Sequence, residues 1–236
     1  MSLKGARVVV VGGSSGIGLA AARQALEAGA EVTIAGRSPD RLKQAQQSLG
    51  SARAVEADIT DAAAIAGVLD GLDRVDHVLI SAGTLRNGAL VKNDLTTLRQ
   101  IVDERLWGVV NVVRSAAPRM TTGSITFTSG GMSTRPRPGS AMLTAMLAAV
   151  EALAPALALE LAPVRVNAVT PGLIDTPLLD ATYGAERDKL VQSRAAVLPG
   201  KRVGTAAEVA QVILLLMTNL YITGEVVRID GGSRFL

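Results

Sequence analysis

The sequence has no cysteine, one histidine and few aromatic residues, namely two tyrosines, two phenylalanines and one tryptophan. Without cysteine there are neither disulfides nor thiol chemistry, and the redox compartment stays open. With 48% hydrophobic residues but only 2% aromatics, the core has to be built from alanine, valine, leucine and isoleucine. That composition suits parallel strands covered by helices on both faces. The histidine, His77, lies at the start of a predicted strand, where we expect a structural role.

Long apolar runs and clusters of like charge are also missing. We find no apolar segment of the ~20 residues that a membrane span requires, and the N-terminal region has no signal-peptide pattern. The net charge of +3 comes from interspersed basic and acidic residues, without the basic face that marks nucleic-acid binding. We therefore expect a soluble, cytoplasmic protein with no membrane, nucleic-acid or metal partner. The length predicts a single domain over residues 1–236.

Apolar, β-rich runs alternate with helical stretches along the whole chain, a pattern typical of repeated β-α-β units. We predict strands at 6–11, 31–35, 52–56, 77–80, 124–127, 164–169 and 226–229. The predicted fold is therefore α/β, a Rossmann-like doubly wound sheet of seven parallel strands with helices on both faces. Expected helix starts are Ser38 with Pro39, Thr60 before Asp61, and a capping box of Thr205 with Glu208.

Residues 8–19, VVVVGGSSGIGL, read as a buried strand that runs into a glycine-rich turn and then a helix. Gly12, Gly16 and Gly18 fit the tasks of a dinucleotide-binding turn, which are a tight bend, close approach of the backbone to a pyrophosphate, and close packing of helix on strand. Free N–H groups and the helix dipole favour negative charge at the start of such a helix. The order of strand, turn and helix strengthens this interpretation.

The glycine spacing, together with Ser14, Ser15 and Ile17, resembles the cofactor loop of the short-chain dehydrogenase/reductase family, although Val11 replaces the usual threonine. The resemblance extends over essentially the whole chain. It implies that further residues line the cofactor: Asp58 and Ile59 at the adenine, Ser81, Ala82 and Gly83 after the fourth strand, and Pro171, Gly172, Ile174 and Thr176 beside the nicotinamide. Asp58 is also a candidate cap for the following helix. Family members are usually dimers or tetramers, so we expect a homodimer or homotetramer.

Arg37 follows the second strand, where proteins that prefer NAD carry an acidic residue for the ribose 2′-hydroxyl. An arginine at this point accommodates a 2′-phosphate through its charge and paired donors. Arg37, with Ser38 and Ser14, therefore predicts NADP(H) rather than NAD(H). The alternative is that Arg37 is an ordinary surface arginine.

The family reduces a carbonyl, or runs the reverse reaction, with an asparagine, a serine, a tyrosine and a lysine. In this sequence Ser129 matches the serine, whereas the positions of the other three fall on Arg105, Met142 and Met146. Methionine has no transferable proton and only a weak acceptor sulfur. The related enoyl reductases place their tyrosine three positions earlier, at Gly139 here, so that variant of the site is absent too. The sequence thus predicts a degenerate catalytic site.

Two further features bear on the site. Tyr183 lies in a stretch, about 175–203, that resembles the family's substrate lid, and it is a remote candidate for a replacement acid. Pro155 lies inside a predicted helix, where it removes a backbone hydrogen bond and favours a kink.

Two functions follow from these features. One is an oxidoreductase with an altered proton pathway, acting on a small apolar carbonyl or alcohol in a pocket of Met132, Met142, Met146, Leu173 and Leu178. The other is a non-catalytic NADP(H)-binding sensor or oligomer partner, because fold alone does not fix function.

Overall fold

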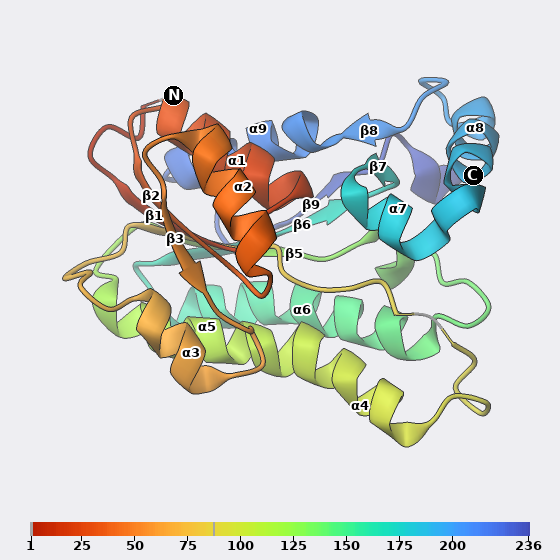
Figure 1. Cartoon of the computed structure of the whole chain (residues 1–236), viewed down its shortest axis with the longest axis horizontal. Coiled ribbons are helices and arrows are strands. Elements are labelled where there is room, and N and C mark those ends of the chain that lie inside the picture. The colour runs from red at the N-terminus through yellow and green to blue at the C-terminus, as the bar shows by residue number, and fades with distance from the viewer. Residues whose placement is uncertain (1, 87) are drawn as a thin grey trace.

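A sheet of seven parallel strands forms the middle layer of the computed structural model, which describes residues 2–86 and 88–236 (Figure 1). The strand order is β3-β2-β1-β4-β5-β6-β9. The strands are β1 (Arg7–Val11), β2 (Glu31–Gly36), β3 (Arg53–Glu56), β4 (His77–Ile80), β5 (Ser124–Thr128), β6 (Arg165–Pro171) and β9 (Val226–Ile229). The predicted doubly wound sheet is confirmed, and its order reverses between β1 and β4, where such sheets bind ligands beyond the carboxyl ends of their strands.

The central strand β1 is buried on both faces, as its run of valines predicts. Val8 to Val11 are each at most 2% exposed. Val8 is in register with Val32 of β2 on one side and with His77 of β4 on the other. Because side chains alternate along a strand, Val8 and Val10 enter one core cluster while Val9 and Val11 enter the other.

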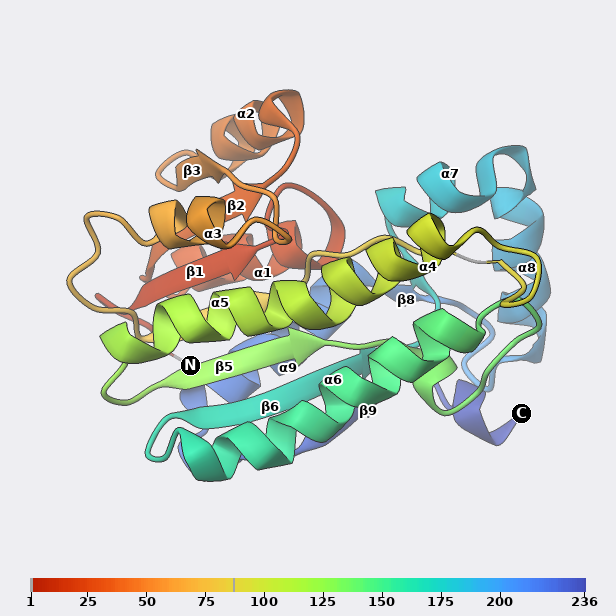
Figure 2. The ribbon, with the colours of Figure 1, turned by 90° about the horizontal axis from the view of Figure 1, so that it is seen from below.

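Helices cover both faces of the sheet. One face carries α1 (Gly16–Glu27), α2 (Pro39–Leu49) and α9 (Ala206–Thr218), which share the core cluster of Val8 and Val10. The other carries α3 (Ala62–Val68), α4 (Leu95–Val102), α5 (Gly108–Ala116) and α6 (Ala141–Glu160). Figure 2 shows α4, α5 and α6 crossing this second face. A π-helical turn, η1 (Asp103–Trp107), joins α4 to α5.

The segment between β6 and α9 contains elements that lie outside the main sheet. It holds α7 (Pro177–Tyr183), α8 (Arg187–Val197) and a two-stranded sheet of β7 (Ile174–Asp175) and β8 (Gly204–Thr205), which the sequence analysis did not predict. The remaining short helices are η2 (Ala117–Arg119), η3 (Gly131–Ser133), η4 (Gly184–Glu186) and η5 (Ser233–Phe235). The segment between β6 and α9 lies beyond the carboxyl ends of the strands (Figure 1).

Two of the three predicted helix starts are confirmed. Ser38 caps α2 by accepting a hydrogen bond from the Arg41 N–H, and Thr205 and Glu208 form a capping box on α9. The prediction for Thr60 is wrong, because α3 begins two residues later and Asp61 accepts from the N–H groups of Ala63 and Ala64. Asp58 does not cap α3 either; its carboxylate accepts from the N–H and hydroxyl of Thr60.

Helix α6 departs from the sequence analysis in two respects. It runs from Ala141 to Glu160 through Pro155 as one helix. It is also long and apolar enough, by length and composition, to cross a membrane, so the expectation that no segment reaches that size is wrong. Core helices pass the same test, and α6 packs on β6 in this domain. The helix contains two charged residues, Glu151 and the terminal Glu160.

Candidate active site

A cavity of about 830 Å³ lies at the carboxyl ends of the strands. It extends from the glycine turn after β1, past the ends of β2, β4 and β5, to the segment of α7 and α8. Nearly all the predicted cofactor residues line it: Gly12, Ser14, Ser15, Gly16, Ile17, Gly18, Arg37, Ile59, Ser81, Ala82, Gly83, Pro171, Gly172, Ile174 and Thr176. Ser38 and Asp58 lie outside this lining, since Ser38 is the α2 cap and Asp58 holds Thr60 and Arg37.

The glycine turn has the close packing that its pattern predicts. Gly12 has a φ of +91°, and a Cβ there would lie 2.5 Å from the backbone nitrogen of Ala82. A Cβ on Gly18 would lie 2.2 Å from the Gly12 carbonyl oxygen, so α1 approaches the turn without a side chain between them. Ser15 precedes α1 without a side-chain cap, so its hydroxyl does not occupy the N–H groups of the first turn. These N–H groups form a potential anion site at the wall of the cavity.

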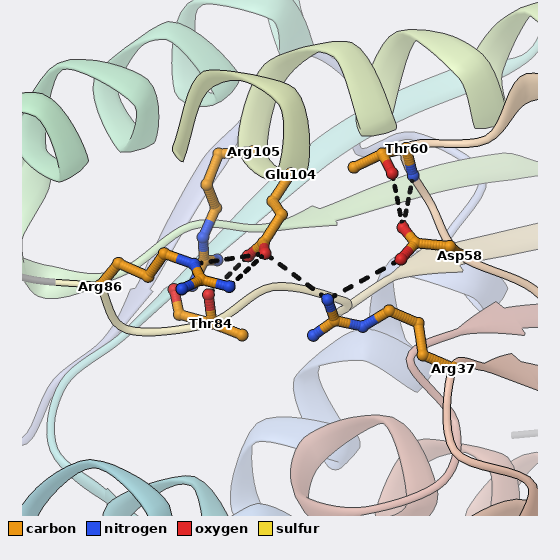
Figure 3. A network of polar contacts seen from close by, with 7 residues as sticks. All are labelled: Arg37, Asp58, Thr60, Thr84, Arg86, Glu104 and Arg105. Atoms are coloured by element: carbon orange, nitrogen blue, oxygen red, sulfur yellow. Dashed lines mark hydrogen bonds and ion pairs between the residues drawn. The ribbon is translucent and has the colours of Figure 1, made fainter. Parts of the chain in front are cut away.

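Arg37 lies in a network of charges centred on Glu104 of η1 (Figure 3). The Arg37 Nη1 atom is 3.5 Å from Glu104 Oε1 and 3.8 Å from Asp58 Oδ2. Glu104 is buried, and it also accepts hydrogen bonds from the Thr84 hydroxyl and from Arg86. Burial opposes its ionisation, but the hydrogen bonds from Thr84 and Arg86 hold the pKa of Glu104 below its ordinary value. Glu104 is therefore a carboxylate, and sequence reasoning missed it.

Arg105, at the position of the family's asparagine, is a buried cation in the wall of the cavity. Its Nη2 donates to the Thr84 carbonyl oxygen at 2.7 Å, and its Nε has no partner among the described residues. A Cβ on Gly83 would lie 2.5 Å from the Arg105 Cζ, so the guanidinium packs directly on the backbone after β4. Burial lowers the pKa of Arg105 to about 10, with Glu104 opposing the shift, and the group stays charged at neutral pH.

Ser129, the retained family serine, lines the cavity, and its hydroxyl contacts two acceptors on α6. Its Oγ is 2.8 Å from Glu151 Oε1 and 3.2 Å from the Leu147 carbonyl oxygen, and both are acceptors. A serine hydroxyl has one proton to donate. Glu151 also accepts from Ser133 and Thr170, so it gathers three hydroxyl groups behind the site. The sequence analysis did not identify Glu151 or this contact.

Met142 and Met146 do not line the cavity, which corrects their predicted place in the pocket. They pack against an apolar cluster whose buried members are Leu98, Ile101, Leu143 and Leu147. Leu147 lines the cavity instead, and Leu143 is 1% exposed. Residues four apart share a helix face, so Leu143, Leu147 and Glu151 form the face of α6 that is turned toward Ser129. Leucine, like methionine, supplies no proton.

The far end of the cavity is formed by the lid-like segment and the loop before α6. Met132, Leu173, Leu178 and Tyr183 line it, as the sequence analysis proposed for the substrate pocket and lid. Three arginines that the sequence analysis did not select also line it: Arg135, Arg137 and Arg194. Arg135 and Arg137 lie in one loop and Arg194 lies far from them in the sequence, so no local motif indicates the group.

The family model of enoyl-(acyl carrier protein) reductases matches residues 11–234. The chain belongs to the short-chain dehydrogenase/reductase family. It is 32% identical to the short-chain dehydrogenase/reductase ucsE of Acremonium sp., over 96% of this chain and 94% of the relative. It is also similar to a solved small-chain dehydrogenase in complex with NADPH, with 30% identity, a TM-score of 0.86 and coverage of 99% and 100% of the two chains. A third similar structure is an apo short-chain oxidoreductase from Pseudomonas aeruginosa PAO1, described as containing an atypical catalytic center, with 27% identity, a TM-score of 0.90 and coverage of 98% of each chain.

Proposed function

We propose that this short-chain dehydrogenase/reductase is an NADPH-dependent reductase whose proton does not come from a tyrosine. The single observation that carries the proposal is the continuous cavity from the glycine turn to Ser129, with Arg105 in its wall. The family binds nicotinamide cofactors, and the cofactor supplies a hydride when it is bound. The protein's part is to bind, orient and stabilise charge.

The residues of the cavity fit a dinucleotide. At Gly12 and Gly18 a Cβ would collide with neighbouring backbone, so these glycines allow the turn to pack closely beside the start of α1. Arg37 and Arg41 line the end nearest β2, together with Ser14, and they supply the positive charge that a 2′-phosphate requires. Arg37 would exchange its long contacts with Asp58 and Glu104 for that phosphate. The structure of an NADPH complex in a relative of 30% identity supports this choice of cofactor.

Arg105 is the group we assign to charge stabilisation. Negative charge develops on a carbonyl oxygen as hydride is delivered, and a fixed cation in a dry site stabilises it. Arg105 is buried, charged and has an unpartnered Nε, so it is prepared for an oxygen acceptor. Ser129 does not serve as the donor while its proton is given to Glu151 or Leu147. Water then supplies the proton, and general acid catalysis worth about 10²- to 10⁴-fold is missing. The solved relative with an atypical catalytic center shows that the fold exists with a changed site.

The test is a titration of the purified protein with NADPH and NADH, followed by nicotinamide fluorescence, and then an assay of NADPH oxidation with aldehydes, ketones and quinones. We expect tighter binding of NADPH than NADH, and slow turnover with part of the panel. The variant Arg37→Gln should weaken NADPH binding and leave NADH binding unchanged, with Arg114→Gln on α5 as the matched control. Equal affinity for both cofactors in the wild type would refute the cofactor assignment.

A second function, a non-catalytic NADP(H)-binding protein, is favoured by Leu147 in the cavity wall where an acid or a lysine would be useful. It predicts nucleotide binding without turnover on any substrate of the panel. The same titration and assay therefore distinguish the two functions.

A further inference from the structure

The substrate end of the cavity carries three arginines without an acidic partner. Arg135 and Arg137 lie in the loop between η3 and α6, and Arg194 lies in α8. No carboxylate of the described chain is within 4.0 Å of any of them, and Arg135 donates instead to the Ser233 carbonyl oxygen at 2.7 Å. The cluster is therefore an uncompensated patch of positive charge.

Several arginines near this cavity do have acidic partners, whereas Arg41 and Arg105 of the lining, like the three arginines, form no ion pair among the described residues. Arg187, at the start of α8, contacts Asp175, Asp180 and Asp188. Arg37 and Arg86 both contact Glu104. Acidic residues are thus available in these segments, and the three arginines remain without them.

The three cations are close enough to influence one another. Burial, then the charges of Arg194 and Arg135, lower the pKa of Arg137, while Tyr183 opposes the shift. Like charges that share a site disfavour each other. A bound anion removes this repulsion, because guanidinium groups form charge-assisted, often bidentate hydrogen bonds to carboxylate and phosphate.

We infer that the substrate of this site is an anion, with a carboxylate or phosphate group held by Arg137, Arg135 and Arg194 and its carbonyl directed toward Arg105. The inference rests on the proposed reductase function for the reacting end of the substrate. Met132, Leu173 and Leu178 line the cavity as well, so the body of the substrate is apolar. The pocket therefore selects an acidic compound with an apolar body, instead of the purely apolar compound that the sequence suggested.

The experiment measures binding and turnover separately. Keto acids with two to eight carbons between carbonyl and carboxylate, their methyl esters, and a phosphorylated ketone with its free alcohol are titrated calorimetrically, with and without NADP⁺. The same compounds are then assayed for NADPH oxidation. We expect at least one acid or phosphate to bind at least about tenfold more tightly than its neutral counterpart, with affinity falling as salt rises. A comparison of the affinities of the keto acids and the phosphorylated ketone identifies whether the site prefers a carboxylate or a phosphate.

Variants locate the anion. Arg137→Gln and Arg194→Gln should each weaken binding of the acid by about tenfold, and Arg137→Lys should restore part of it. The ester should bind all variants alike. Arg114→Gln on α5, which does not line the cavity, is the matched control, and NADPH fluorescence with thermal melting verifies that each variant is folded.

Equal binding of acids and neutral counterparts, or acid binding that survives both glutamine substitutions, overturns the inference. Binding of acids that depends on Arg137 without any NADPH oxidation supports the anion site and refutes the reductase function instead. The two failures are therefore distinguishable.

Discussion

Ser129 illustrates how a retained residue can lose its role through its hydrogen bonds. In the family a serine orients the substrate oxygen, which requires a free proton on its hydroxyl. Here that proton is directed to Glu151 or to the Leu147 carbonyl oxygen, both on α6. The identity of a side chain at a motif position therefore does not determine its function. The hydrogen-bond acceptors near the serine hydroxyl determine the direction in which it donates its proton.

We expect Ser129→Ala to leave kcat/KM for carbonyl reduction within about threefold of the wild type, since a serine acting as donor would cost about 10²-fold or more. Unfolding should become easier by about 1 kcal/mol because one hydrogen bond is lost, while Glu151 keeps Ser133 and Thr170. Steady-state kinetics and urea denaturation measure the two effects. A loss of 10²-fold would show that the hydroxyl turns toward the substrate during turnover.

Arg105 is the converse, a replacement to which we assign a proposed function. We expect Arg105→Met to reduce kcat/KM by about 10²-fold, as the loss of one preorganised charged donor does elsewhere. The variant should lose no more than about 1 kcal/mol of stability, since replacing a buried charge by an apolar side chain of similar length is often neutral. Arg105→Lys, which keeps a charge but not the guanidinium geometry, serves as the control. A methionine variant with unchanged kinetics would assign Arg105 to structure alone.

At the scale of elements, local patterns predicted the fold well and the site less well. The valine run of β1 and the glycine turn depend on neighbouring residues, so their structure follows from the sequence. The face of α6 does not: each residue rotates the helix by about 100°, and a one-residue difference exchanges Met146 for Leu147 in the cavity wall. Arg137 and Arg194 meet only because the chain folds, and the buried contacts of Glu104 and Glu151 have no sequence signal.

The orientation of α6 can be tested by rebuilding the family's pair of residues. Leu143→Tyr with Leu147→Lys should raise the rate of carbonyl reduction by at least about tenfold, since general acid catalysis is worth about 10²- to 10⁴-fold. Met142→Tyr with Met146→Lys is the matched control, because neither methionine lines the cavity whereas Leu147 does. Turnover is compared at equal fractions of folded protein, as judged by circular dichroism. A gain only in the methionine pair would reverse the assignment of the helix face.

At the scale of the whole molecule, the two ends of the sheet have different tasks. The carboxyl ends hold the cavity and its charges, some of them without a protein partner. At the amino ends, buried polar groups are hydrogen-bonded within the protein: His77 Nδ1 lies 2.9 Å from Ser124 Oγ, and Arg165 donates to the carbonyl oxygens of Leu216 and Met217. Arg165 thereby joins β6 to the end of α9. The predicted structural role of His77 accords with these contacts.

His77 gives the molecule a pH-dependent stability of its own. Burial, with the charge of Arg165 adding and Asp76 opposing, lowers the pKa of His77 from 6.5 to about 4. Between these pH values the unfolded chain binds a proton that the folded chain does not, so stability is complete above pH 6.5 and falls as the pH drops toward 4. The loss of folding free energy amounts to about 3 kcal/mol across the interval.

Urea denaturation of the wild type and of His77→Asn at pH 4 to 8 measures this loss. Because no other histidine is present, the variant should lack this part of the slope while the carboxylates, which titrate lower, affect both proteins alike. Parallel curves for the two proteins would mean that the pKa of His77 is the same in the folded and the unfolded chain, so that burial does not lower it.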